Sequence, residues 1–124
     1  MKPRHVHRSD DCRIISDILQ HIGDKWTVLV VSTLGTERMR FNALRRTIGG
    51  ISQKILTSTL RKLERDGFVT RTVHPTVPPS VDYELTPLGR ELLVPVKALG
   101  DWAYINTQRI HSARRAFDER SAER

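Results

Sequence analysis

The chain has 124 residues, of which 38% are hydrophobic and 28% are charged, and this composition is typical of one soluble globular domain. Lysine and arginine number 21 against 14 acidic residues, so the formal net charge of +7 favours a polyanionic partner such as nucleic acid. No stretch approaches the roughly 20 apolar residues of a membrane-spanning helix, and no apolar core follows the basic N-terminus as it does in a signal peptide. We therefore expect a cytoplasmic protein without membrane contact. Because Cys12 is the single cysteine and paired metal-ligand patterns are absent, we expect no intrachain disulfide, no metal and no cofactor.

The first predicted element is a helix over residues 10–23, which follows a polar arm at 1–9. Asp10 or Asp11 is its expected N-cap, because a short carboxylate accepts hydrogen bonds from free backbone N–H groups. Gly23 is its expected end, because glycine tolerates the left-handed conformation that follows many helices. Its apolar residues recur at the three- and four-residue spacing of one helical face: Ile14, Ile15, Ile18, Leu19 and Ile22.

A second helix is expected between Asp24 and Gly35. It is apolar on several sides, so it is predicted to lie at the centre of the fold, and a short strand within 37–41 follows it. The next helix covers residues 41–48 and ends at the glycine pair 49–50. This order is typical of the first helix and the turn of a helix-turn-helix motif.

The second helix of that motif is predicted over residues 52–66. Ser52 is a favourable N-cap, and Ile51 and Leu56 have the spacing of a hydrophobic staple, which fixes the angle at which the chain enters a helix. Gly67 is its expected end. The apolar residues after Leu56 continue along one face and leave the opposite face polar and basic.

Two strand-like runs, 68–73 and 81–85, flank a loop with three prolines, which cannot lie inside a strand ladder. Residues 68–86 therefore predict a β-hairpin, the wing. Thr86 and Pro87 then have the pattern of a helix start, and the last helix is expected over 87–112 with a kink at Pro95. Residues 113–124 form a charged tail that we expect to fray. The predicted fold is mainly α with a small β-hairpin, a single winged helix-turn-helix domain over 1–124.

The polar face of the helix at 52–66 suits the major groove of DNA, because the N-terminal part of this second helix meets base edges in helix-turn-helix proteins. Glutamine pairs with adenine, and lysine or arginine with guanine. The predicted base-reading residues are Ser52, Gln53, Lys54, Thr57, Ser58 and Arg61. The predicted DNA-backbone contacts are Arg40, Arg45, Arg46, Lys62, Arg65, Arg71 and His74. Each of these residues alone could equally be an ordinary solvated side chain, and the prediction rests on their combination with the turn, the hairpin and the net charge.

Several segments of the chain also resemble a known family, the HxlR-type regulators, a MarR-like class. The segments that carry the resemblance are 22–27 (IGDKWT), 40–44 (RFNAL), 50–57 (GISQKILT), 60–67 (LRKLERDG) and 81–86 (VDYELT), with Cys12, Gly89 and Trp102. Two features depart from the family pattern: Asp24 stands where glycine is frequent, and the part after Trp102 is longer and more basic.

The resemblance implies a homodimer joined through its first and last helices, at 10–23 and 87–112, with one recognition helix of each protomer in the major groove. Such a dimer binds an inverted repeat whose half-sites are about 34 Å apart, one turn of the duplex. Apolar stripes on both helices offer surface for this interface, although some positions must serve core packing. The predicted interface residues are Ile14, Ile15, Ile18, Leu19, Ile22, Leu92, Val96, Leu99, Trp102 and Ile105.

Cys12 lies at the start of the first predicted helix, where the helix dipole favours a thiolate, although Asp10 and Asp11 oppose it. The resemblance implies sensing of a small electrophile or oxidant through this cysteine. The alternative is a small buried apolar residue, as free cysteines often are.

Other classes of function are less well supported by the sequence. It contains no nucleophile elbow and no phosphate-binding loop, so we expect no enzyme. A winged helix that docks a protein would expose aromatic residues between 53 and 65, where none occurs. Single-stranded RNA would also call for aromatic stacking surfaces.

Overall fold

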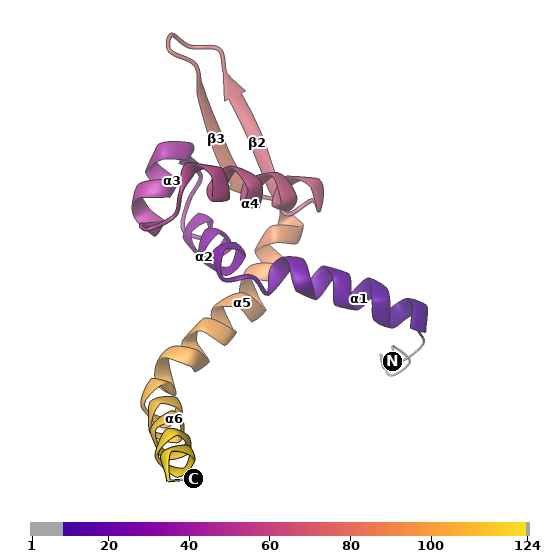
Figure 1. Ribbon diagram of the computed structural model, residues 1–124. Helices are drawn as coiled ribbons and strands as arrows, with labels where there is room; N and C mark the ends of the chain where they lie inside the picture. Colours follow the sequence, from indigo (N-terminus) through magenta and orange to yellow (C-terminus); the bar gives the residue numbers. More distant parts are fainter. Residues whose placement is uncertain (1–8, 124) are drawn as a thin grey trace.

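The computed structural model describes residues 9–123, which form a mainly helical fold with a small antiparallel sheet (Figure 1). The elements in chain order are α1 (Ser9–Ile22), α2 (Lys25–Leu34), β1 (Met39–Arg40), α3 (Phe41–Ile48), α4 (Gln53–Arg65), β2 (Val69–His74), β3 (Ser80–Leu85), α5 (Pro87–Ile105) and α6 (Thr107–Ala122). The predicted winged helix-turn-helix is confirmed: α3 and α4 are the helix pair, and β2 and β3 are the wing. Most of the predicted arm at 1–9 lies outside the described residues. Over the part of the chain that is described, no helix is long and apolar enough to cross a membrane.

The core lies between α2 and the helix pair. Val30, Val31 and Leu34 of α2 are fully buried and cluster with Leu44 of α3. From α4, the inner face contributes three more buried leucines, namely Leu56, Leu60 and Leu63. Burying a leucine side chain stabilises a fold by roughly 1.5–3 kcal/mol, so this contact fixes the orientation of α4 on the body.

The start of α4 follows the predicted pattern. The backbone N–H of Ile55 donates to Oγ of Ser52 at 3.1 Å, and Ile51 and Leu56 are both buried in the core. At the other end, Gly67 has a φ of +85°, a left-handed conformation that glycine adopts at little cost. Both ends of the helix are therefore specified by local sequence.

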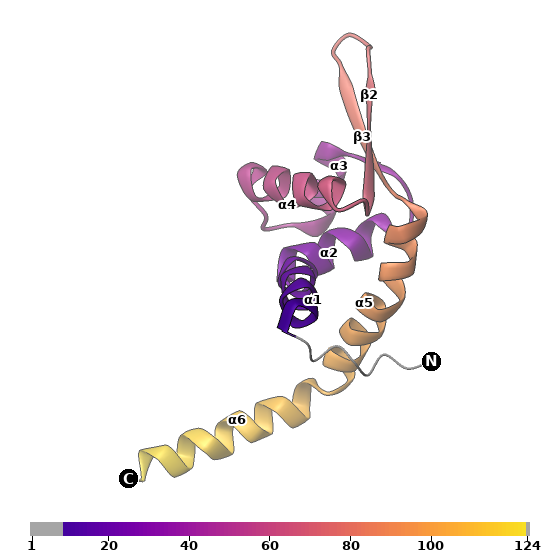
Figure 2. The ribbon, with the colours of Figure 1, turned by 90° about the vertical axis from the view of Figure 1, so that its right-hand side faces the viewer.

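The sheet has the strand order β1-β3-β2, all antiparallel. Met39 of β1 pairs with Tyr83 of β3, which also pairs with Arg71 of β2. The hairpin of β2 and β3 projects well beyond the helices, whereas α6 extends from the opposite end of the molecule (Figure 2). In Figure 1, α1 also projects from the body, so both terminal helices leave large parts of their surface uncovered.

The terminal helices differ from the predictions. The first helix begins at Ser9, before the predicted caps, and its end at Gly23 lacks the expected left-handed conformation. The predicted last helix is divided at Asn106 into α5 and α6, and Pro95 lies inside α5. There the side-chain Nδ2 donates to the Trp102 carbonyl at 2.9 Å, and such a polar side chain competes with the backbone hydrogen bonds of a helix. The prediction of a fraying tail after residue 112 is wrong, because α6 continues to Ala122.

The buried face of α4 predicts a large loss of stability on truncation of Leu56. Leu56→Ala should lower the free energy of unfolding by about 2–5 kcal/mol, because it leaves a cavity in the core. The adjacent Ile55 is 40% exposed, so Ile55→Ala should cost much less. Urea denaturation of both variants at one protein concentration checks this. Equal losses would contradict the placement of α4.

Candidate nucleic-acid interface

The outer face of α4 carries the predicted base-reading residues. A shallow groove along this face is lined by Gln53, Lys54, Thr57, Ser58, Arg61 and Lys62, all of them exposed. The hydroxyl of Ser52 is also exposed, but its oxygen already accepts the N–H of Ile55 as the helix cap. The structure thus brings five of the six base-reading candidates to one face and gives the sixth a structural role at its start.

The cations of α4 are available to a ligand. Within residues 9–123, Lys54, Arg61, Lys62 and Arg65 form no ion pair with a carboxylate. Glu64 is the acidic residue of this helix, and it contacts Arg71 of the wing, with 3.5 Å between Oε1 and Nε. The outer face of α4 therefore keeps its positive charge.

Two arginines of α3 have different surroundings. Nε of Arg45 donates to the carbonyl of Ile51 at 3.1 Å, so this side chain links the end of α3 to the residue before α4. Arg46 is exposed and lines hollows on both sides of α3, one toward the wing and one toward Gly49 and Gly50. Arg45 thus braces the helix-turn-helix, whereas Arg46 is open to a phosphate.

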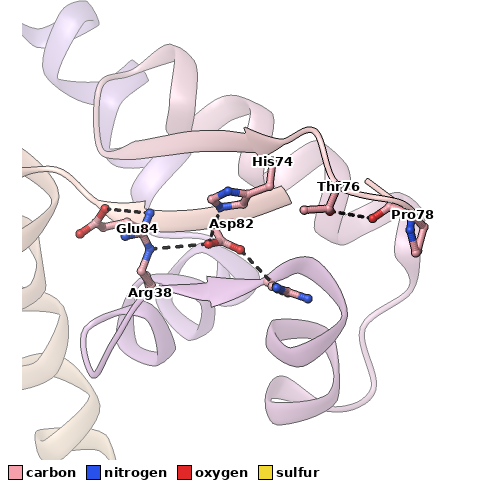
Figure 3. Close-up of polar contacts among 7 residues, drawn as sticks. Arg38, His74, Thr76, Pro78, Asp82 and Glu84 are labelled. Carbon is pink, nitrogen blue, oxygen red and sulfur yellow. Dashed lines mark hydrogen bonds and ion pairs between the residues drawn. The ribbon is translucent and has the colours of Figure 1, made fainter. Parts of the chain in front are cut away.

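The remaining backbone candidates, Arg40, Arg71 and His74, lie in or beside the wing and are paired with carboxylates. Figure 3 shows His74 with Asp82. Nε2 of His74 lies 2.9 Å from Oδ2 of Asp82, and Nε of Arg40 lies 3.7 Å from Oδ1 of the same residue. Arg38 contacts both Asp82 and Glu84. Sequence reasoning missed this cluster. A signal for it was available in the sequence. Arg38 and Arg40 are two residues apart, as are Asp82 and Glu84, and this spacing places each pair on one face of a sheet.

The opposite face of β3 is apolar. Tyr83 is buried there, with its ring centroid 6.5 Å from that of Phe41. Burial raises the pKa of the Tyr83 hydroxyl above its ordinary value; the nearby Arg71 acts against this shift and Glu64 adds to it to a smaller extent. The hydroxyl therefore stays neutral at physiological pH.

The predicted interface residues fall into two groups. On α1, Ile14, Ile15, Ile18 and Leu19 are exposed, as are Leu99, Trp102 and Ile105 on α5. Val96 is only 6% exposed and belongs to the core of the protomer, and Ile22 and Leu92 are partly buried. The exposed members give α1 and α5 apolar faces that this protomer leaves uncovered.

Cys12 is exposed on α1 of this protomer, so the protomer itself does not bury it as the alternative of an apolar cysteine would require. At the other end of α1, Nδ1 of His21 lies 3.2 Å from Oδ2 of Asp66, the residue that ends α4. A side-chain contact therefore connects the cysteine-bearing helix with the recognition helix. Among residues 9–123, no group of three or more His, Cys, Asp and Glu side chains is placed to hold a metal ion.

An amphipathic second helix with a free basic outer face, beside a β-hairpin, defines a DNA-binding winged helix-turn-helix protein. The HxlR-like helix-turn-helix family model matches residues 21–111. The chain therefore belongs to the HxlR family of MarR-like transcriptional regulators.

Similar proteins agree with this assignment. The uncharacterised HTH-type transcriptional regulator YtfH of Escherichia coli is 43% identical over 106 residues, which cover 86% of this chain and 82% of YtfH. The solved structure of the transcriptional regulator ytfH from Salmonella typhimurium is 41% identical with a TM-score of 0.77, and the match covers 81% of this chain and 89% of that one. The redox regulator HypR in its reduced form is 38% identical with a TM-score of 0.73, over 79% of this chain and 97% of HypR.

The contact of Arg45 with Ile51 predicts that charge alone does not replace this arginine. Arg45→Lys keeps the positive charge but loses the Nε–H donor, so it should destabilise the fold by about 0.5–1.5 kcal/mol. DNA affinity should fall while its salt dependence stays unchanged. Arg46→Lys is the matched control and should leave stability as it is. Urea denaturation and salt titrations of duplex binding measure both. A stability of Arg45→Lys equal to that of the parent would contradict the bracing role.

Proposed function

We propose that the protein is a sequence-specific regulator that binds an inverted-repeat operator as a homodimer, with α4 of each protomer in the major groove. The observation that carries this proposal is the outer face of α4, which is exposed and basic and whose cations form no ion pair within residues 9–123. A single helix of this kind fits the major groove, about 12 Å wide, where each base pair presents a distinct pattern of donors and acceptors.

Within this face, the first two turns of α4 suit direct contact with bases. Gln53 can donate to and accept from adenine, and Lys54 can donate to guanine, with Thr57 and Ser58 beside them and Arg61 one turn further. Arg46, Lys62 and Arg65 lie to the sides of this segment and suit phosphate oxygens, which fix the register of a protein on DNA without reading sequence. At the wing, Arg40, Arg71 and His74 would contact the backbone after reorienting from their carboxylate partners.

The homodimer would join through the exposed residues of α1 and α5. Each of these two helices carries several exposed large apolar side chains, and exposed apolar patches mark interaction sites in soluble proteins. The net charges of the two ends also complement each other: α1 has three aspartates and one arginine, whereas α6 has four arginines and two acidic residues. A twofold dimer would place two copies of α4 on one side of the assembly, as an inverted repeat requires.

We further propose that Cys12 senses oxidants or electrophiles. Its exposure on α1 supports access by a small reagent, and HypR, a redox regulator, is among the similar structures. The thiolate would add to an electrophilic carbon. Alternatively, the Cys12 thiol and a small thiol would together lose two electrons and two protons to an oxidant such as diamide, which becomes the hydrazine, and the two sulfur atoms would join as a mixed disulfide. Displacement of α1 would reach α4 through His21 and Asp66, which are in contact.

The operator proposal is tested by selecting bound duplexes from a random pool and footprinting the selected sequence. Wild-type protein should protect two half-sites about 34 Å apart on one face of the duplex. Lys54→Ala should select a different sequence with a cost of about 1–3 kcal/mol at one base pair. Arg46→Ala should weaken binding to all sequences alike and lower the salt dependence. Protection of one asymmetric site, or the same selected sequence with both variants, would contradict the proposal.

The sensing proposal is tested by operator affinity before and after treatment with diamide plus a small thiol, or with a quinone. Modification of Cys12 should change the affinity, and the Cys12→Ser variant should not respond. Mass spectrometry confirms the modification. An unchanged affinity of fully modified protein would exclude sensing through this residue.

A further inference from the structure

Three basic side chains contact a single carboxylate at the base of the wing. Asp82 lies on β3 with its side chain only 16% exposed. Its Oδ2 contacts Nε2 of His74 at 2.9 Å and Nε of Arg38 at 3.7 Å, and its Oδ1 lies 3.7 Å from Nε of Arg40 (Figure 3). Three positively charged or chargeable side chains thus converge on a single acid.

The position of Asp82 in the sheet explains this convergence. β3 is the middle strand, and Asp82 is in register with Arg40 of β1 on one side and with Thr72 of β2 on the other. Arg40 immediately precedes α3, and His74 is the last residue of β2 before the wing loop. Within residues 9–123, the side chains of Arg40 and His74 form no other hydrogen bond or ion pair, so Asp82 alone links them.

Arg40 and His74 lie beside a part of the wing that has no lysine and no arginine, namely residues 75–81, which form the wing loop and the beginning of β3. Arg71 lies toward the other end of β2 and is paired with Glu64. Arg40 lines a hollow between the start of α3 and the wing loop, together with Arg46 and Ser80. The guanidinium-bearing side chain of Arg40 is 71% exposed, so a further anion can reach it while it remains beside Asp82.

We propose that Asp82 is a positioning residue for DNA binding, which holds Arg40 at the edge of this hollow and His74 beside Arg40 so that they contact one backbone phosphate. This inference rests on the proposed function, because it requires a bound duplex. A long side chain loses rotamer freedom when it binds, and a partner that orders the side chain beforehand reduces that loss. The carboxylate would thus strengthen binding to a polyanion although its own charge is repelled by it.

A purely electrostatic role of Asp82 predicts the opposite effect of its neutralisation on DNA affinity, and this difference makes the proposal testable. If Asp82 only added negative charge near DNA, Asp82→Asn would bind duplex DNA more tightly and with a steeper salt dependence. If Asp82 positions Arg40 and His74, Asp82→Asn should weaken DNA binding about tenfold. The slope of log affinity against log salt should then fall by about 2 for the dimer, since each phosphate contact contributes about 0.9.

Glu84→Gln is the matched control. Glu84 lies two residues along the same strand and contacts Arg38 at 3.9 Å, so its neutralisation removes an equal charge and leaves Asp82 with Arg40 and His74. We expect affinity equal to that of the wild type or slightly higher. Asp82→Glu is the second variant: it keeps the charge but moves the carboxylate, so it should also weaken binding, whereas a pure charge effect predicts no change.

A double-mutant cycle separates positioning from a general loss of structure. Arg40→Ala should lower the affinity and the salt slope in the wild-type background and have little further effect in Asp82→Asn. All variants are measured on one duplex that the wild-type protein binds, with unfolding midpoints recorded alongside. Tighter or unchanged binding by Asp82→Asn, or additive effects of the two substitutions, would overturn the positioning role. A wild-type protein that binds no duplex would instead overturn the proposed function.

Discussion

The burial of three leucines of α4 against α2 is the contact on which the rest of the structure depends. Leu56, Leu60 and Leu63 recur at helical spacing, and their burial turns the opposite side of the helix outward. The cap at Ser52 and the left-handed Gly67 fix where the helix starts and stops. Because packing energy and local capping agree, the polar residues of α4 are presented on a rigid element rather than on a loop, and a rigid element places contacts more accurately.

Electrostatics divides the interface into two parts. The cations of α4 lack internal partners among the described residues, so they contribute fully to attraction of a polyanion. Three basic side chains in or beside the wing are paired with carboxylates: Arg40 and His74 with Asp82, and Arg71 with Glu64. Arg71 and Glu64 are both exposed, and an exposed ion pair adds little stability, typically below about 1 kcal/mol. The pairs with Asp82, whose side chain is only 16% exposed, have the orienting role proposed above. α4 would then supply readout of bases and the wing an ordered contact with the backbone.

Local sequence signals predicted most of the fold, because capping residues, glycines and prolines act within a few positions. The serine cap at 52 and the proline-rich loop were therefore read correctly. The break at Asn106 was not predicted, because it depends on one side chain that bonds back to the Trp102 carbonyl. The sequence instead indicated Pro95 as the site of a kink. For the candidate site, the sequence predicted the helix that carries it, α4, and the polar residues of its outer face. The cluster of basic side chains around Asp82 was not predicted, because its members come from separate segments of the chain and meet only through the register of the sheet.

The central claim is that the outer face of α4 lies in the major groove. It is tested most directly by attaching an iron chelate that cleaves DNA to a single cysteine on this face, through Ser58→Cys in a Cys12→Ser background. The account predicts strand cleavage centred in the major groove of each half-site, and almost none from the same reagent on α6 through Arg115→Cys. Cleavage from α6 with none from position 58 would contradict it.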